Sequence, residues 1–282
     1  MNFKIISDSS SDILTVKNVA YSTVPLKIST SERVFTDTEV LDTSEMLEYL
    51  SKYNGRSSSS CPNVSEWLSA FEDAENVFCV TITSGLSGSY NSACAALQEY
   101  TEADPKRKGY VIDSLSVGPE SALIIEKLCE LISEGNSFEE IVKKIDEYKK
   151  STHLIFGLRS LHNLAVNGRV SPVVAKVAGI LGIRIIGKAS EKGTLDITNK
   201  SRGAERAISD IIKNMSLCGY DGKKVRIHHC ENPEVAETIK SRILALHPNA
   251  DILVQETRGL CCFYAERGGV LVGYEGGIKE EK

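Results

Sequence analysis

Three kinds of feature are missing from the sequence, and each absence excludes a class of protein. No apolar run approaches the length of a membrane span, so an integral membrane protein is not expected. The net charge of −5 lacks the basic excess of a general nucleic-acid binder. The eight cysteines include no C-x-x-C pair, which argues against a zinc site or a redox dithiol. What remains is a chain of 282 residues, 41% hydrophobic and 25% charged, which is typical of a globular protein.

Several catalytic and metal-binding signatures are also absent or incomplete. No G-x-G-x-x-G follows the first expected strand, which disfavours a dinucleotide-binding fold. Residues 182–188 match the first part of a phosphate-binding loop, but Ala189 stands where magnesium binding needs Ser or Thr. Residues 85–89 (GLSGS) resemble a nucleophile elbow that lacks its final glycine. Residues 228–230 (HHC) are disfavoured as a metal site, because adjacent strand residues point to opposite faces.

The most informative stretch of the chain carries no charge at all. Between Glu75 and Glu99 there is no Lys, Arg, Asp or Glu. The pattern predicts a strand over residues 77–82, a turn of Ser and Gly, and a helix over residues 86–100. A helix start offers free N–H groups and the positive end of its dipole, so this segment could bind an anion through neutral donors. Ser and Gly are equally typical of a capped helix after a tight turn, and this alternative stays open.

Strand and helix patterns alternate along the first half of the chain. Strands are expected at residues 3–7, 24–28, 77–82 and 110–112. Helices are expected at residues 44–52, 64–74, 86–100 and 119–133, and another begins at Ser137 with a capping-box pattern. This alternation predicts an α/β fold with a mainly parallel sheet that is covered by helices.

The second half of the chain predicts another α/β unit with a mixed sheet. Expected strands lie at residues 154–156, 184–187, 195–199, 225–230, 252–255 and 270–274. Expected helices lie at residues 158–167 and 202–217, and a third begins at Asn232. We therefore expect two α/β domains, residues 1–150 and 151–282, which could exchange a segment. The first residues resemble a strand rather than a signal peptide, which predicts a cytoplasmic protein.

Five short motifs follow one another along the chain. They are residues 8–12 (DSSSD), 59–63 (SSCPN), 84–90 (SGLSGSY), 113–114 (DS) and 168–171 (GRVS). In this order they resemble the motifs of the DegV family, the bacterial fatty-acid-binding proteins that include FakB. The resemblance extends over nearly the whole chain. Five motifs in order are far more specific than any one of them alone.

The resemblance implies two α/β domains with one long-chain fatty acid in the cleft between them. In the family, the carboxylate is held by hydroxyls and backbone amides. The matching residues of this chain are Ser59 and Ser87, with Ser84 and Gly88 in support. In the FakB branch, the protein presents the acid to an ATP-dependent kinase for phospholipid synthesis. The resemblance therefore implies a carrier that has no cofactor and no chemistry of its own.

Three departures from the family motifs matter, and two basic residues match contacts that the family makes with its partner. Ser59 replaces Thr, Cys61 replaces Gln, and Tyr264 replaces the His that neighbours the carboxylate. A phenol can still donate a hydrogen bond. Arg169 and Arg202 match basic residues that contact the kinase in the family. Neutralisation of a helix end by Arg169 and a solvated surface charge at Arg202 remain the alternatives.

Two other functions stay open from the sequence. A serine-dependent acyl hydrolase would use Ser87 as its nucleophile, but it would also need a histidine within reach. A binding module for another small carboxylate would use the same uncharged turn. The apolar residues of segment 168–186 could line a tunnel for an acyl chain, which favours the fatty acid, although core packing would explain them too.

Overall fold

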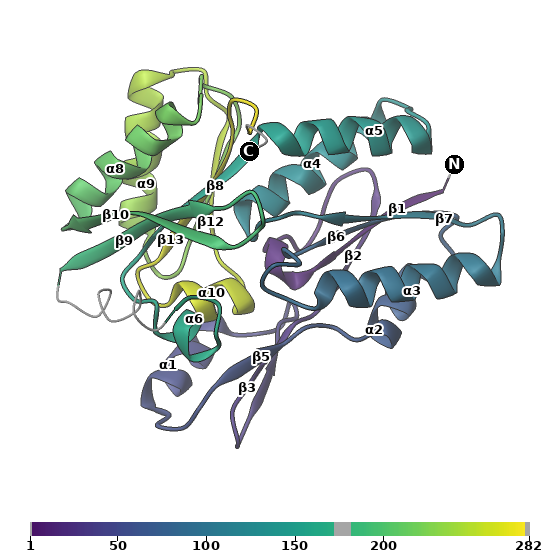
Figure 1. Ribbon diagram of the computed structural model, residues 1–282, viewed down its shortest axis with the longest axis horizontal. Coiled ribbons are helices and arrows are strands. Elements are labelled where there is room, and N and C mark those ends of the chain that lie inside the picture. Colours follow the sequence, from purple (N-terminus) through teal and green to yellow (C-terminus); the bar gives the residue numbers. More distant parts are fainter. Residues whose placement is uncertain (1, 172–181, 280–282) are drawn as a thin grey trace.

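The computed structural model describes residues 2–171 and 182–279. Its first half is built on a four-stranded parallel sheet in the order β2-β1-β6-β7 (Figure 1). The strands are β1 (Phe3–Asp8), β2 (Ala20–Val24), β6 (Asn76–Thr81) and β7 (Lys108–Asp113). Every residue of β6 is buried. Burial on both faces is typical of a parallel sheet between two layers of helices.

Helices cover both faces of this sheet. The helices α2 (Val64–Phe71) and α3 (Ser89–Ala103) lie on one face, and α4 (Pro119–Ser133) and α5 (Phe138–Tyr148) lie on the other (Figure 1). Alternate residues of β6 point to opposite faces: Val77 packs with α2 and α3, whereas Phe78 packs with α4 and α5. Among the described helices, none combines the length and the apolar character that crossing a membrane requires.

The second half contains a six-stranded mixed sheet in the order β10-β9-β8-β13-β11-β12. Its strands are β8 (Thr152–Leu158), β9 (Ile183–Ala189), β10 (Leu195–Arg202), β11 (Val225–His229), β12 (Ile252–Glu256) and β13 (Val270–Glu275). Only β11 and β12 pair in parallel. The helices α8 (Ala204–Leu217) and α9 (Pro233–Leu246) cover one face through an aliphatic core.

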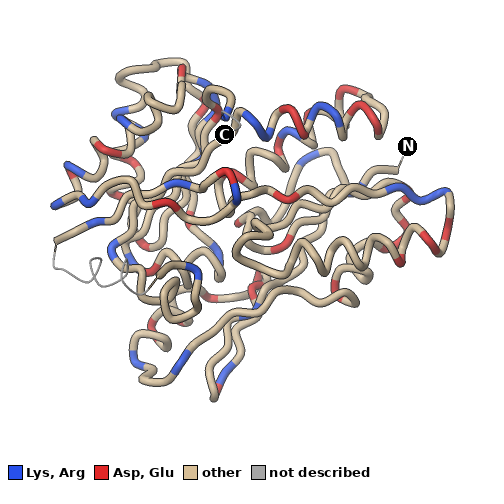
Figure 2. The backbone as a smooth tube through the Cα atoms, viewed as in Figure 1, with Lys and Arg blue, Asp and Glu red and all other residues tan. Residues whose placement is uncertain are grey.

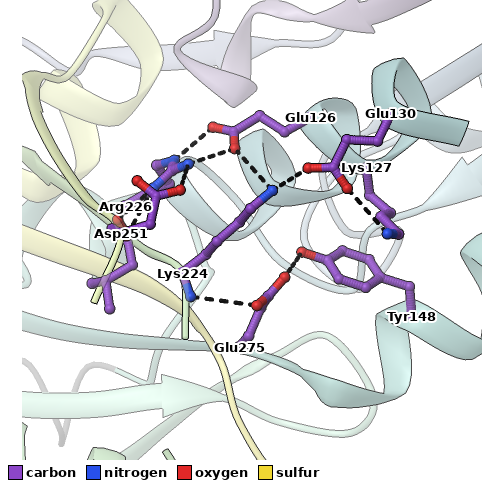
Figure 3. Close-up of polar contacts among 9 residues, drawn as sticks. Glu126, Lys127, Glu130, Tyr148, Lys224, Arg226, Asp251 and Glu275 are labelled. Atoms are coloured by element: carbon purple, nitrogen blue, oxygen red, sulfur yellow. Dashed lines mark hydrogen bonds and ion pairs between the residues drawn. The ribbon is translucent and has the colours of Figure 1, made fainter. Parts of the chain in front are cut away.

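Helix α4 joins the two halves because it packs against both sheets. Its carboxyl-terminal half is held to the second sheet by ion pairs (Figure 3). Arg226 of β11 donates from Nε to Glu126 Oε1 at 2.6 Å and from Nη2 to Asp251 Oδ2 at 3.0 Å. Lys224 Nζ contacts Glu130 on the next turn of α4. We call these five side chains the ion-pair cluster.

A small third sheet was not expected from the sequence. It is antiparallel and contains β3 (Lys27–Ser29), β4 (Val34–Thr36) and β5 (Ser58–Ser60). The sequence pattern predicts one strand over residues 24–28, but Pro25 separates β2 from β3. Proline fixes its own φ and lacks a backbone N–H, and at this point the chain leaves the edge of the first sheet and enters the third sheet.

Three short elements lie near the third sheet. They are α1 (Thr43–Lys52), α6 (His162–Val166) and α10 (Gly259–Ala265). The 3-10 helices η1 (Ser9–Ser11) and η2 (Lys149–Ser151) complete the described elements. Several predicted helix bounds were wrong. The helix α3 spans Ser89–Ala103 rather than residues 86–100, and α2 ends at Phe71 rather than at residue 74. The helix α8 begins at Ala204 rather than at residue 202, and α6 is shorter than residues 158–167 because β8 continues to Leu158.

The predicted fold class is confirmed. A parallel sheet forms from residues 3–113, and a mixed sheet forms from residues 152–275. The division into domains at residue 150 stays a prediction, because α4 contacts both sheets. Residues 172–181, which form most of the predicted apolar segment 168–186, lie outside the described residues.

Candidate functional site

A cavity of about 260 Å³ lies where the two halves meet. Leu154 and Phe156 of β8 line the cavity, whereas Ile155 between them packs with α8. The cavity therefore lies on the face of the second sheet that is opposite to α8 and α9. The apolar lining residues come from both halves: Leu26, Ile82, Leu86, Val117, Leu154, Phe156, Leu158, Leu164, Leu195, Leu260, Cys261, Ala265 and Leu271. A mostly apolar wall with few polar groups is typical of a site for an apolar small molecule.

Polar residues from separate segments of the chain also line the cavity, and some of them contact one another. They are Ser59, Ser60, Cys61, Ser87, Gly88, Arg169 and Tyr264. The hydroxyls of Ser59 and Tyr264 form a hydrogen bond of 2.7 Å, and Arg169 Cζ lies 5.9 Å from the centre of the Tyr264 ring. Cys61 lies against the start of α3, since a Cβ placed on Gly88 would be 3.3 Å from Cys61 Sγ. We call these seven polar lining residues the head-group site.

Ser87 is the serine of the uncharged turn that faces the cavity. Its Oγ accepts a hydrogen bond from Ser89 N at 3.3 Å, so its hydroxyl hydrogen can point to a ligand. Ser89 Oγ is committed elsewhere, because it donates to Asp8 Oδ2 at 2.6 Å. Gly88 is the N-cap of α3 and provides no side-chain cap. The first N–H groups of α3 thus lie beside Ser87 with the positive end of the helix dipole.

Arg169 brings a positive charge to the head-group site. The chain turns back at Gly168, whose φ of +75° belongs to the left-handed region that glycine favours. Arg169 Nε donates to Leu86 O at 3.3 Å, and Nη1 donates to Asn167 O at 2.5 Å. Among the described lining residues, Arg169 alone is charged. A guanidinium has five N–H donors, so these two contacts leave donors for an anion.

Tyr264 lies on α10, and backbone N–H groups at the start of this helix donate hydrogen bonds to two buried carboxylates. Asp37 accepts hydrogen bonds from Gly259 N at 2.8 Å and from Leu260 N at 2.9 Å. Asp12 accepts one from Arg258 N at 2.7 Å. Burial raises the pKa of Asp37 to about 6, against the lowering effect of the Leu260 N–H.

Four of the predicted ligand-binding residues come together at the head-group site: Ser59, Ser87, Gly88 and Tyr264. Ser84 does not join them. It is exposed, it does not line the cavity, and its N–H donates to Asp113 Oδ1 at 3.1 Å.

The two arginines that were predicted to bind a partner lie in different places. Arg169 lines the cavity, whereas Arg202 is exposed at the end of β10 and does not line it. The described residues hold no group of three or more His, Cys, Asp or Glu that could bind a metal. His228 of the HHC segment instead bonds to Asp12 Oδ2 through Nδ1 at 2.8 Å.

Sequence reasoning missed the residues that hold the site in place. Asp8 lies in a motif that was noticed, yet a lone aspartate in a loop is equally a metal ligand or a cap. Asp37 carried no signal, because its partners on α10 are more than 200 positions away. Figure 2 shows charges of both signs over most helices and none along the start of α3, which agrees with the uncharged stretch of the sequence.

The sequence of this chain is similar to those of known proteins. A family model described as "Uncharacterised protein, DegV family" matches residues 2–275. This chain belongs to the DegV family. A DegV domain-containing protein of Streptococcus pyogenes serotype M3 is 43% identical over 279 residues, which covers 98% of this chain and 100% of the relative.

Two solved DegV structures resemble this chain over almost its whole length. A DegV protein of Eubacterium eligens loaded with heptadecanoic acid has a TM-score of 0.96 and 44% identity, and the match covers 97% of this chain and 99% of that one. The Fatty Acid Kinase (Fak) B3 protein of Streptococcus pneumoniae, loaded with linoleic acid, has a TM-score of 0.95 and 43% identity, with coverage of 98% and 99%. The resemblance to DegV proteins that the sequence motifs indicated is confirmed.

Proposed function

We propose that this DegV protein binds one long-chain fatty acid as its carboxylate, with the acyl chain in the apolar part of the cavity. The observation that carries the proposal is that the described lining residues divide into a large apolar set and a small polar head-group site. That division matches an amphiphile with one small charged end. The fatty acids bound to the Eubacterium eligens and Streptococcus pneumoniae relatives support it.

The head-group site contains the donors that a carboxylate needs. Arg169 supplies a fixed positive charge, and a charge-assisted hydrogen bond is stronger than a neutral one. Ser87 and the start of α3 supply a hydroxyl and N–H groups on another side. Because the hydroxyls of Ser59 and Tyr264 bond to each other, one hydrogen of this pair remains for the ligand.

We propose further that the protein is a non-catalytic, cytoplasmic carrier that presents the acid to a fatty acid kinase. The relative named as a Fatty Acid Kinase B3 protein supports this role. None of the five histidines lines the cavity, so Ser87 has no imidazole there that could take its proton. Activation of the carboxylate by phosphoryl transfer would therefore be the work of the kinase. No observation favours an acyl hydrolase, and the apolar wall disfavours a small carboxylate without a tail.

A binding titration tests the proposal. Delipidated protein is titrated with palmitate or oleate, and saturation at one ligand per chain is expected. Ser87→Ala should weaken binding by about 1.5–3 kcal/mol, on the order of tenfold or more, because a hydrogen bond to a charged group is lost. The matched control is Ser69→Ala on the exposed side of α2, which should leave affinity unchanged.

Two outcomes of this titration would change the account. Absence of saturable binding by the delipidated protein would contradict the proposed function. An effect of Ser84→Ala equal to that of Ser87→Ala would move the carboxylate toward the exposed side of the turn, where the sequence prediction also placed a donor.

A further inference from the structure

Both ends of the turn between β6 and α3 donate hydrogen bonds to one carboxylate, that of Asp8. Asp8 Oδ2 accepts hydrogen bonds from Ile82 N at 2.9 Å and from Ser89 Oγ at 2.6 Å. Ile82 follows the last residue of β6, and Ser89 is the first residue of α3. A single oxygen atom therefore closes the turn that carries Ser87 and Gly88 to the cavity.

The carboxylate of Asp8 is itself held firmly. Its Oδ1 accepts hydrogen bonds from Ser10 N at 3.2 Å and from Ser10 Oγ at 2.5 Å. Asp8 ends β1, and it is 1% exposed. A buried carboxylate that receives four hydrogen bonds has little freedom to reorient. Asp8 does not line the cavity, so it can act on a ligand only through the residues that it holds in place.

The other supports of the turn act at different points. Asp113 Oδ1 accepts from Ser84 N at 3.1 Å, and Thr83 Oγ1 donates to Gly193 O at 2.9 Å on the hairpin between β9 and β10. Both contacts hold the first part of the turn. Asp8 alone among these supports also holds Ser89, which directly follows Gly88 and donates its N–H to Ser87 Oγ.

We propose that Asp8 is a positioning residue for the head group, fixing the Ser87 hydroxyl and the start of α3 relative to Arg169. This inference rests on the proposed function and deepens it. A hydrogen bond weakens steeply when its distance or angle departs from the preferred range, so a loosened turn costs head-group affinity. Ile82 and Leu86 of the turn also line the apolar wall. Most of the wall comes from β8, α10 and β13, which Asp8 does not contact through these hydrogen bonds, so tail binding should largely persist.

A comparison of two ligands with the same tail tests the proposal. Palmitate and 1-hexadecanol have equal chain length, but only palmitate has a carboxylate. Wild type should prefer palmitate. Asp8→Asn and Ser89→Ala should each reduce that preference by about three- to tenfold, through weaker palmitate binding and nearly unchanged hexadecanol binding. A residue that only maintained the fold would weaken both ligands in parallel.

Ser89→Ala removes the hydrogen bond between Ser89 and Asp8 through the loss of one hydroxyl. If Asp8→Asn does not fold, Ser89→Ala alone decides the test. The matched control is Asp42→Ala. Asp42 caps α1 by accepting a hydrogen bond from Glu45 N at 2.9 Å, but it is exposed and does not line the cavity. Its loss should leave the preference for palmitate unchanged.

Two results would overturn the proposal, and they are distinguishable. A wild-type preference retained by Ser89→Ala, or by a folded Asp8→Asn protein, shows that Asp8 does not position the head group, while the proposed function stands. A wild-type protein that binds neither ligand contradicts the proposed function, and the role of Asp8 falls with it.

Discussion

The two ends of helix α4 lie at very different parts of the junction between the sheets. Near its amino end are the cavity and the buried aspartates, where carboxylates accept hydrogen bonds from backbone N–H groups and hydroxyls. Near its carboxyl end is the ion-pair cluster, where carboxylates of α4 meet Arg226 and Lys224 (Figure 3). The buried carboxylates of Asp8 and Asp37 bond to uncharged N–H and O–H donors, whereas Glu126 and Glu130 meet opposite charges.

The difference suggests that the two ends of α4 have different roles. A carboxylate that is surrounded by N–H and O–H groups holds short turns at defined angles, which an anion-binding site needs. A cluster of paired charges joins larger elements and is less demanding in geometry, although breaking a buried pair is costly. We therefore expect substitutions at the cavity end to change affinity, and substitutions at the ion-pair cluster to change stability.

The largest effect is expected at Arg169. Arg169→Ala removes the charge of the head-group site and should weaken palmitate binding by about 3 kcal/mol, on the order of a hundredfold. Stability should change little, because the guanidinium bonds only to two carbonyls among the described residues. Isothermal titration with Arg202→Ala as the matched control measures this. A loss smaller than threefold would show that the cavity end does not depend on charge.

At the other end, Arg226→Ala should lower the free energy of unfolding by about 2–3 kcal/mol. This lies below the range for fully buried pairs because Glu126 is partly exposed. Palmitate affinity should stay within twofold of wild type. Urea unfolding of the ligand-free protein gives the first value, and Lys52→Ala, which breaks an exposed pair with Glu48, serves as control. A large loss of affinity would remove the division between the two ends.

A smaller, pH-dependent effect is expected at Asp37. Its pKa in the folded state is raised to about 6 from the ordinary value of 3.8, so the folded state binds the proton more tightly than the unfolded state. Stability contributed by Asp37 should therefore rise as the pH falls through 6. Between pH 7.5 and pH 5, wild type should gain roughly 1.4 kcal/mol relative to Asp37→Asn.

Urea unfolding of both proteins at the two pH values measures the Asp37 effect. The subtraction removes the contributions of the other titrating groups. An equal pH response in wild type and in Asp37→Asn would mean that the carboxyl does not titrate in this range.

The smallest effect concerns Arg202. Arg202→Ala should leave palmitate affinity unchanged and slow acyl-phosphate formation by a cognate fatty acid kinase about two- to fivefold, the scale of one exposed ion pair. Added salt should reduce the difference between variant and wild type, because exposed charges are screened. Equal rates with and without Arg202 would leave its surface charge without a role in docking.

The sequence predicts the local parts of this protein well. The uncharged stretch placed a strand, a turn and a helix in the right order, because hydrophobic periodicity and the preferences of Ser and Gly act over a few residues. The capping box at Ser137 forms as its pattern indicates. The predicted start of α3 was wrong, since Ser and Gly are as typical of the end of a loop as of the start of a helix.

The parts that the sequence did not predict depend on distant contacts. The third sheet needs β5 to pair with β3, about 30 positions earlier in the chain. The contacts of Asp12 with His228 and of Asp37 with α10 join the two ends of the chain. Arg169 was assigned to a surface, and only the fold shows that the turn at Gly168 brings it to the cavity.

A crystal structure of the protein with palmitate tests the central claim most directly. The account predicts one palmitate per chain, with its carboxylate within hydrogen-bonding distance of Ser87 Oγ and the Arg169 guanidinium, and with its tail along Leu154, Phe156 and Leu271. A palmitate carboxylate that lies away from both Ser87 and Arg169, or a cavity that stays empty at saturating palmitate, would contradict it.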